Sequence, residues 1–397
     1  MPALNHNNVI HNSGCEKREL RIEYPVSNIK LQTTIETLIF ATMILLNELH
    51  LGGLFRALTF KRVGNIVKTS LSFLISALSK KTIVWGVPPV LTIEPTNQCN
   101  LHCPLCTTGS GEMERSPGRM NLQTFEKIIE HMGNDIFFML IYHQGEPYMN
   151  KDFFTFVELA KQKNIYVTTS TNGHYFTDRN IKKTLDCRLD SMIISLDGIT
   201  QQSYEKYRVG GQLQRVLDGT ARLMAEKKRR KMSTPNVALQ FLVMKHNEDE
   251  IPKVRKIASQ LGVDRLLLKN IEVRSLDEAK KWLPSNKKFR RYHFNGKSYI
   301  VKGLDKNACT RPWLSTLINW DGTFVPCCFD KNGNYPMGNI HEISGIHDMW
   351  FNDDFTRFRT QLLQQRKSID ICRNCNQGFG SFLPARLWRK KKTSNDC

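Results

Sequence analysis

The sequence contains no apolar run long enough to span a membrane. Its N-terminal uncharged stretch, Thr37 to Asn47, is roughly half as long as a transmembrane helix. The first residues, MPALNHNNVIHNSGCEK, also lack the apolar segment of a secretory signal. We therefore expect a cytoplasmic protein. In that reducing compartment, clustered cysteines are better interpreted as metal ligands or redox groups than as disulfides.

Acidic residues are few relative to basic ones. The 397 residues include 57 Lys and Arg against 37 Asp and Glu, which gives a net charge of +20. This excess favours an anionic partner, such as RNA, a lipid headgroup surface or an acidic peptide, without selecting one of them. With 40% apolar and 24% charged residues, the composition is otherwise typical of a globular protein of two or three domains.

Residues 1–84 are expected to form an N-terminal extension with amphipathic helices. Gly52-Gly53 and Gly64 should separate two stretches with helical spacing: Ile35, Leu38, Ile39, Thr42, Leu45 and Leu46, then Ile66, Ser70, Phe73, Leu74 and Ala77. The favoured interpretation is packing on the next domain. The alternative is contact with an anionic membrane surface, because basic residues lie nearby: Arg56, Lys61, Arg62, Lys68, Lys80 and Lys81.

Residues 85–290 alternate between short apolar runs and helical patterns. The predicted strands lie near 90–94, 136–142, 165–170, 190–195, 236–244 and 265–269. The predicted helices cover 122–132, 152–163, 177–186, 213–229 and 248–260, the first between Asn121 as N-cap and Gly133. This alternation predicts an α/β fold with a parallel sheet that is open or curled into part of a barrel.

Three thiols, Cys99, Cys103 and Cys106, lie within eight residues just after the first predicted strand. Each can hold one iron of a cubane cluster, which leaves the fourth iron open to another ligand. The alternative is a zinc site with His102 as the fourth ligand.

Polar loops follow the next three predicted strands. They contain Gly145-Glu146-Pro147, then Asn172, then Ser195 and Asp197. The carboxyl ends of parallel barrel strands meet on one face, so these loops should converge beside the thiols and suit a small polar cofactor. Taken singly, each loop is better explained as a turn, but loops in register after successive strands are harder to dismiss in this way.

Residues 88 to about 270 resemble the radical S-adenosylmethionine (radical SAM) superfamily, whose CxxxCxxC loop matches Cys99, Cys103 and Cys106. The resemblance implies a partial (β/α)6 barrel, a [4Fe-4S] cluster, and SAM bound at its open iron and cleaved to a 5'-deoxyadenosyl radical. It also implies that Gly145-Glu146-Pro147 contacts the methionyl amine. Ser195, with Asn172 and Arg208, would reach the ribose or carboxylate. Leu105 departs from the family, which usually has an aromatic residue there to pack on adenine.

Residues 291–380 carry a second set of cysteines, followed by a basic tail at 381–397. The order Cys309, Gly322, Cys327-Cys328 and Cys372-Arg-Asn-Cys375 resembles a SPASM domain. It implies one auxiliary [4Fe-4S] cluster held by Cys309, Cys327, Cys372 and Cys375, with Cys328 as the alternative to Cys327.

Two catalytic candidates follow from this second set. Whichever thiol of the Cys327-Cys328 pair is left over could donate a hydrogen atom to a substrate radical, and Cys328 is the candidate. Asp330 could act as a base. The more ordinary interpretations are a structural thiol and an exposed turn carboxylate.

The predicted function is a radical SAM/SPASM oxidoreductase or maturase that abstracts a hydrogen atom from a peptide or protein side chain. An electron donor such as flavodoxin or ferredoxin would reduce its cluster. The alternatives are a lipid-linked or small polar substrate, an RNA substrate, and a non-enzymatic metal-binding scaffold. RNA is disfavoured because no RNA-binding motif accompanies the basic runs at 227–231 and 389–392.

Overall fold

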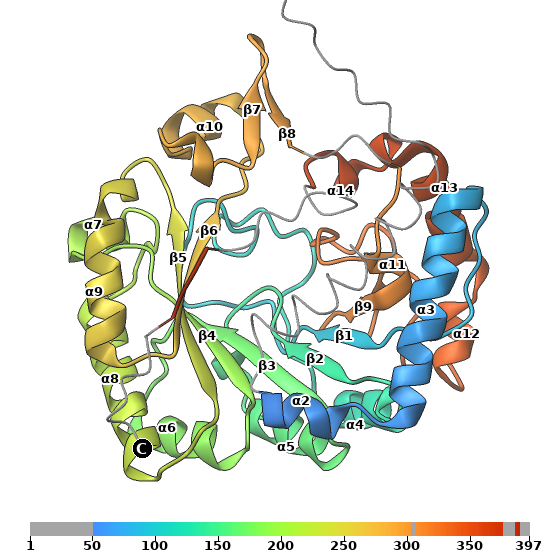
Figure 1. Ribbon diagram of the computed structural model, residues 1–397, viewed down its shortest axis with the longest axis horizontal. Coiled ribbons are helices and arrows are strands. Elements are labelled where there is room, and N and C mark those ends of the chain that lie inside the picture. The colour runs from blue at the N-terminus through green and yellow to red at the C-terminus, as the bar shows by residue number, and fades with distance from the viewer. Residues whose placement is uncertain (1–50, 303–306, 376–385, 390–397) are drawn as a thin grey trace, which may run out of the picture.

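The fold was analysed in a computed structural model, which describes residues 51–302, 307–375 and 386–389. Its centre is a nine-stranded sheet with the order β10-β9-β1-β2-β3-β4-β5-β6-β11, curled into part of a barrel (Figure 1). The predicted helical stretch from Ile35 to Leu46 lies outside the described residues.

The six predicted strands of the barrel are confirmed, each end within two residues. They are parallel to one another and cover β1 (Val90–Ile93), β2 (Phe138–Ile141), β3 (Tyr166–Thr171), β4 (Ser191–Ser195), β5 (Asn236–Val243) and β6 (Arg265–Asn270). Their carboxyl ends, and the loops that follow them, therefore share one face of the barrel.

Helices cover the outside of these strands (Figure 1). They are α4 (Leu122–Met132), α5 (Phe153–Gln162), α6 (Asp178–Asp186), α7 (Gln201–Glu205), α8 (Leu213–Arg229) and α9 (Ile251–Leu261). Asn121 caps α4 as predicted, since its Oδ1 accepts a hydrogen bond from Thr124 N at 2.8 Å.

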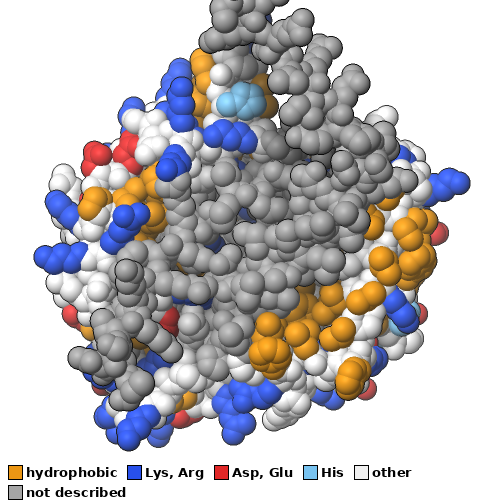
Figure 2. All heavy atoms as spheres, viewed as in Figure 1, with side chains coloured by type: hydrophobic (Ala, Val, Ile, Leu, Met, Phe, Trp, Pro, Cys, Tyr) orange, Lys and Arg blue, Asp and Glu red, His pale blue; other side chains and the backbone are white. Residues whose placement is uncertain are grey.

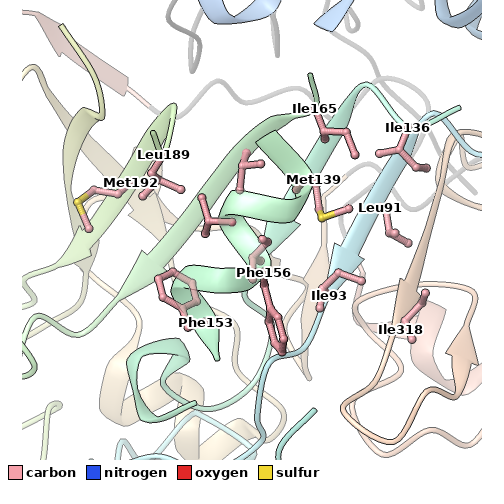
Figure 3. Close-up of a cluster of buried hydrophobic side chains, with 14 of the residues drawn as sticks. Leu91, Ile93, Ile136, Met139, Phe153, Phe156, Ile165, Leu189, Met192 and Ile318 are labelled. Atoms are coloured by element: carbon pink, nitrogen blue, oxygen red, sulfur yellow. The ribbon is translucent and has the colours of Figure 1, made fainter. Parts of the chain in front are cut away.

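The main core lies between the strands and these helices. Phe153 and Phe156 of α5 extend toward Leu91, Ile93 and other apolar side chains of the sheet (Figure 3). Phe156 also stacks on Phe125 of α4, with ring centroids 4.4 Å apart. This apolar layer positions the loops on the barrel face.

The C-terminal segment is joined to the barrel through the sheet itself. Its strand β9 (Ser315–Ile318) pairs in parallel with β1, and β10 (Phe324–Val325) pairs antiparallel with β9. The remaining elements are α10 (Leu276–Trp282), β7 (Tyr292–Phe294), β8 (Tyr299–Val301), α11 (Arg311–Leu314), α12 (Ile346–Trp350), α13 (Asp353–Gln365) and α14 (Asp370–Arg373). Within the predicted basic tail, β11 (Arg386–Arg389) pairs antiparallel with β6.

Two helices precede the barrel, α2 (Leu51–Ala57) and α3 (Phe60–Ser79). The prediction that Gly52-Gly53 and Gly64 separate helices was wrong, because Gly52-Gly53 lie inside α2 and Gly64 lies inside α3. An interior glycine costs a helix about 1 kcal/mol, which tertiary contacts offset here. None of the described helices is both long and apolar enough to cross a membrane.

Candidate functional site

The loop after β1 presents its three thiols on the carboxyl face of the barrel. Cys103 is buried, and Cys99 and Cys106 are partly buried. Leu101 N lies 3.4 Å from Cys99 Sγ and donates to it, while Cys106 Sγ lies 3.8 Å from Gln144 Oε1 in the loop after β2. Burial raises the pKa of Cys99 to about 12, so iron must displace a proton when it binds there.

Arg208 extends from the region after β4 toward this loop. Its Nη1 lies 3.8 Å from Cys103 Sγ, and its Nε donates to Asp197 Oδ2 at 2.6 Å. The other oxygen, Asp197 Oδ1, accepts from Leu242 N at 2.7 Å. Because both oxygens are engaged, Asp197 orients Arg208 toward the thiol.

The loop after β2 approaches the cysteine loop through its backbone. Gly145 has φ +71°, and a Cβ on it would lie 2.4 Å from Thr96 O and 2.6 Å from Gln98 O. Glu146 N then donates to Gln98 O at 2.8 Å. Only glycine fits this turn, which explains the residue type at position 145.

The Glu146 carboxylate joins this loop to the end of β3. It accepts hydrogen bonds from Thr171 Oγ1 at 2.8 Å, Asn172 N at 2.7 Å and Tyr148 N at 3.2 Å. Burial raises its pKa to about 7 despite these donors. Asn172 in turn places its Nδ2 3.8 Å from Cys99 Sγ and donates to Asn100 Oδ1 at 2.8 Å.

The convergence of loops predicted from strand order is therefore present. Gly145, Glu146, Asn172 and Arg208 all contact the cysteine loop. Pro147 begins the short 3-10 helix η1 (Pro147–Met149), and Ser195 is the buried last residue of β4.

The second set of cysteines also comes together, from three separate segments. Cys309 precedes α11, Cys327 and Cys328 follow β10, Cys372 lies in α14, and Cys375 follows it. Arg311 lies among them, and the charges of Cys328, Cys327, Cys309 and Cys375 raise its pKa.

The adjacent thiols of Cys327 and Cys328 share a hydrogen bond. This bond raises the pKa of Cys327 and lowers that of Cys328. Cys187 is separate from both sets, because its thiol donates to Thr184 O at 3.4 Å at the end of α6. Cys15 and Cys397 lie outside the described residues.

The expectation of an exposed carboxylate at Asp330 was wrong. Its side chain is fully buried, and its oxygens accept from Asn334 N at 2.8 Å and Tyr335 N at 2.9 Å. Burial raises its pKa. In this geometry Asp330 orders the loop that follows Cys328.

A cavity of about 320 Å³ is lined by residues that neighbour cysteines of both sets in the sequence, although no cysteine lines it. It is bounded by the segment after Cys106, the segment after β6 and the segments around Cys328 and Cys372, and its lining includes Thr107, Glu112, Glu272, Arg274, Phe329 and Ile371. Both signs of charge are present, so it can accept a polar molecule.

Sequence reasoning missed a buried polar group at the adjoining ends of β1, β2 and β9. Glu94 and Arg115 form a bidentate ion pair, with both contacts at 2.7 Å. Nearby, the buried His143 Nε2, both amide atoms of Asn319 and Trp320 Nε1 have no hydrogen-bond partner among the described residues. Glu94 and His143 could have been noted because each lies within two residues of the end of an apolar strand, whereas no sequence signal marks Asn319.

Comparisons with known proteins agree with this arrangement. The family model described as the radical SAM superfamily matches residues 93–258, and the one described as the iron-sulfur cluster-binding SPASM domain matches residues 309–376. The chain belongs to the radical SAM superfamily. The two matched segments contain the two sets of thiols.

Named relatives of this radical SAM enzyme cover most of its length. It is 25% identical to a tungsten-containing aldehyde ferredoxin oxidoreductase cofactor-modifying protein of Pyrococcus furiosus, over 77% of this chain and 94% of the relative. It is 24% identical to mycofactocin maturase MftC of Mycobacterium tuberculosis, over 72% of this chain and 75% of the relative. The solved structure of Streptococcus suis SuiB bound to S-adenosylmethionine shares the fold, with a TM-score of 0.55 and 12% sequence identity. The match covers 88% of this chain and 84% of SuiB.

The donor set at each site fits an iron-sulfur cluster. The loop after β1 supplies three thiols, and the N–H groups of Leu101, Asn172 and Arg208 are directed at two of their sulfurs. Such donors favour the thiolate form that iron requires. Among the described residues, no three His, Cys, Asp or Glu side chains surround a single-ion position.

Proposed function

We propose that this radical SAM enzyme abstracts a hydrogen atom from a peptide or protein side chain. The observation that carries the proposal is a cavity that segments adjoining Cys106, Cys328 and Cys372 line together. Relatives include mycofactocin maturase and PqqA peptide cyclase, and the net charge of +20 suits an acidic peptide.

The proposed roles follow from the contacts. Cys99, Cys103 and Cys106 hold the SAM-binding cluster, which when bound supplies the electron that cleaves SAM. The backbone of Gly145 to Pro147 and the side chain of Asn172 line the space beside it, and Ser195 lies at the end of the next strand. Arg208, fixed by Asp197, places a positive charge at Cys103.

Four thiols hold the auxiliary cluster in this proposal: Cys309, Cys327, Cys372 and Cys375. Cys328 remains as the hydrogen-donor candidate, because it adjoins Phe329, which lines the cavity. Asp330 lines the same cavity and is proposed to act through the loop that it orders.

The unpaired polar group at His143, Asn319 and Trp320 is proposed to bind the substrate. Buried polar atoms in folded proteins are normally hydrogen-bonded, so four unpaired atoms in one region favour a ligand that pairs with them. Burial lowers the pKa of His143 to about 3, which keeps the imidazole neutral. Neutral donors and acceptors of this kind suit amide or hydroxyl groups.

The proposal is tested by assaying 5'-deoxyadenosine after anaerobic reconstitution with iron and sulfide, in the presence of SAM and dithionite. We expect product from the wild type and from Cys187→Ala, whose thiol is buried away from both sets. The variant Cys99→Ala/Cys103→Ala/Cys106→Ala should give none. Product from that triple variant, or zinc in place of iron in the wild type, would favour the metal-binding scaffold instead.

A one-electron protein donor of the flavodoxin or ferredoxin type is proposed to replace dithionite in the cell. The basic surface implied by the charge of +20 would attract such acidic proteins. Substituting reduced flavodoxin for dithionite in the same assay should preserve deoxyadenosine formation and make its rate fall with salt. A rate that is independent of salt would argue against electrostatic docking.

A further inference from the structure

Helix α3 carries polar residues on the face that it packs against the protein. Its buried residues are Arg62, Asn65, Thr69, Ser72, Phe73 and Ser76. Phe73 is the only large apolar side chain among them. The prediction of which residues pack was therefore only partly correct. Phe73 is buried as expected, but the other predicted residues lie at the margin of the buried face: Ile66, Ser70, Leu74 and Ala77.

The buried polar side chains of α3 have partners. Asn65 Nδ2 donates to Val87 O at 2.8 Å, and Val87 N donates back to Asn65 Oδ1 at 3.0 Å. Ser76 Oγ likewise pairs with both Ile83 O and Ile83 N at 2.9 Å. Hydrogen bonds thus hold much of this face, together with the apolar contact between Phe73 and Trp313, whose ring centroids lie 5.4 Å apart.

The opposite face of α3 is apolar and exposed. The spacing of Phe60, Val63, Val67, Leu71 and Leu78 places them along one side of the helix, and each is more than a third exposed, Phe60 at 99%. We call these five residues the α3 stripe. Two aromatic side chains from neighbouring segments are also exposed, Phe55 at 73% and Trp85 at 51%.

The surface around the α3 stripe is positively charged. The sequence from Leu51 to Ile93 contains no Asp or Glu. Arg62 is buried, Lys61 is exposed but pairs with Asp135 at 2.8 Å, and the other exposed cations of this segment are Arg56, Lys68, Lys80 and Lys81. Hydrophobic side chains gather on the side of the molecule where α2 and α3 lie, with basic side chains near them (Figure 2).

We propose that the α3 stripe binds the surface of an anionic membrane, with the helix lying parallel to the bilayer. A helix with an apolar outer face and flanking cations meets both requirements of such a surface, apolar insertion and attraction to anionic headgroups. A second copy of this chain, docked stripe to stripe, would bring like charges together, since Leu51 to Ile93 contain no acidic residue and the neighbouring Asp135 already pairs with Lys61. Lipid headgroups supply the missing negative charge.

The test is co-sedimentation of the full chain with vesicles of phosphatidylcholine alone or containing about 30% phosphatidylglycerol. We expect binding to the anionic vesicles, reduced at high salt because Lys and Arg contribute to it. Val67→Gln/Leu71→Gln should weaken the binding by about tenfold or more, because two inserted apolar side chains are lost. Lys68→Gln/Lys80→Gln should weaken it less, and only on anionic vesicles.

The matched control is Leu276→Gln on α10, where a similarly exposed leucine lies away from α3. Failure of the wild type to bind anionic vesicles would overturn the proposal, as would equal binding by Val67→Gln/Leu71→Gln. A concentration-dependent dimer in lipid-free solution that the double variant abolishes would identify a second copy as the occupant. Deoxyadenosine formation without vesicles should be unchanged in every variant, which separates this test from that of the proposed function.

Discussion

At the scale of single residues, Arg208 contacts two groups: it forms an ion pair with Asp197 and lies beside the thiol of Cys103. The Asp197 side chain is fully buried, so Arg208→Gln would leave a buried carboxylate without its cation. We expect a loss of about 3 kcal/mol in the free energy of unfolding, measured by urea titration. Arg222→Gln, which breaks an exposed pair with Asp178, should cost less than about 1 kcal/mol. Equal losses in the two variants would contradict the prediction.

Gly145 allows a second comparison of matched variants. Gly145 and Gly111 both have positive φ, +71° and +79°, but a Cβ would clash with backbone oxygens only at Gly145 and would meet nothing within 4 Å at Gly111. Alanine at either position should lower the free energy of unfolding by about 1 kcal/mol, because residues with a side chain disfavour positive φ. Gly145→Ala should lower the free energy of unfolding by clearly more than Gly111→Ala does. It should also reduce SAM binding, measured by equilibrium dialysis. If both alanine variants bind SAM alike, the close approach of the two loops is not required.

His143 predicts a pH effect on stability. Its pKa is lowered from 6.5 to about 3 by burial, so above about pH 6.5 folded and unfolded chains are both neutral there. As the pH falls from 6.5 toward 3, only the unfolded chain takes up the proton, and this residue removes up to about 1.4 kcal/mol of stability per pH unit. In urea titrations at pH 7.5, 6 and 5, His143→Gln should show a shallower loss than the wild type. Parallel curves would contradict this assignment.

At the scale of elements, Arg62 connects α3 to the ends of two barrel helices. Its guanidinium donates to five carbonyl oxygens at 2.8–3.3 Å, two of them after α4 and two after α5: Ala57, Gly133, Asn134, Lys163 and Asn164. A cation at helix carboxyl ends is also favoured by their dipoles. Arg62, the first residue of the polar face of α3, is thus also the main anchor of this helix on the barrel.

Removal of this anchor should loosen α3 from the barrel. Arg62→Met leaves buried carbonyls without a donor, and we expect a loss of at least about 3 kcal/mol in the free energy of unfolding. Hydrogen exchange should become faster in α3 before it does in β1 to β6. Arg56→Met, at an exposed position in α2, is the control and should melt like the wild type. Unchanged exchange in α3 after Arg62→Met would show that apolar contacts alone hold the helix.

At the scale of the whole molecule, the two proposed clusters predict an iron count of about eight per chain. Cys372→Ser/Cys375→Ser should retain about four irons and the ability to cleave SAM, because the three thiols after β1 are untouched. Residues 307–375 should then be cut faster in limited proteolysis, since a cluster joining Cys309, Cys327, Cys372 and Cys375 would tie that segment together. About eight irons in the double variant would refute this ligand set.

The local order of the chain follows from its sequence. Strand and helix periods, the caps of α4 and the cysteine spacings involve neighbours within a few residues, so they can be recognised without knowing the fold. The order of strands then predicted that Gly145, Glu146 and Asn172 would meet the cysteine loop, because parallel strands end on one face. The class of chemistry was predictable for the same reason.

Other features depended on contacts between distant segments, which only the tertiary structure decides. Asp330 is buried because the loop to Tyr335 folds over it, and the unpaired side chains of Asn319 and His143 follow neighbouring parallel strands because β9 adds to the sheet beside β1. The outward face of α3 was decided by Arg62 and Asn65, whose acceptors belong to other elements. Periodicity finds an apolar face, but hydrogen-bond partners elsewhere in the fold decide which face is buried.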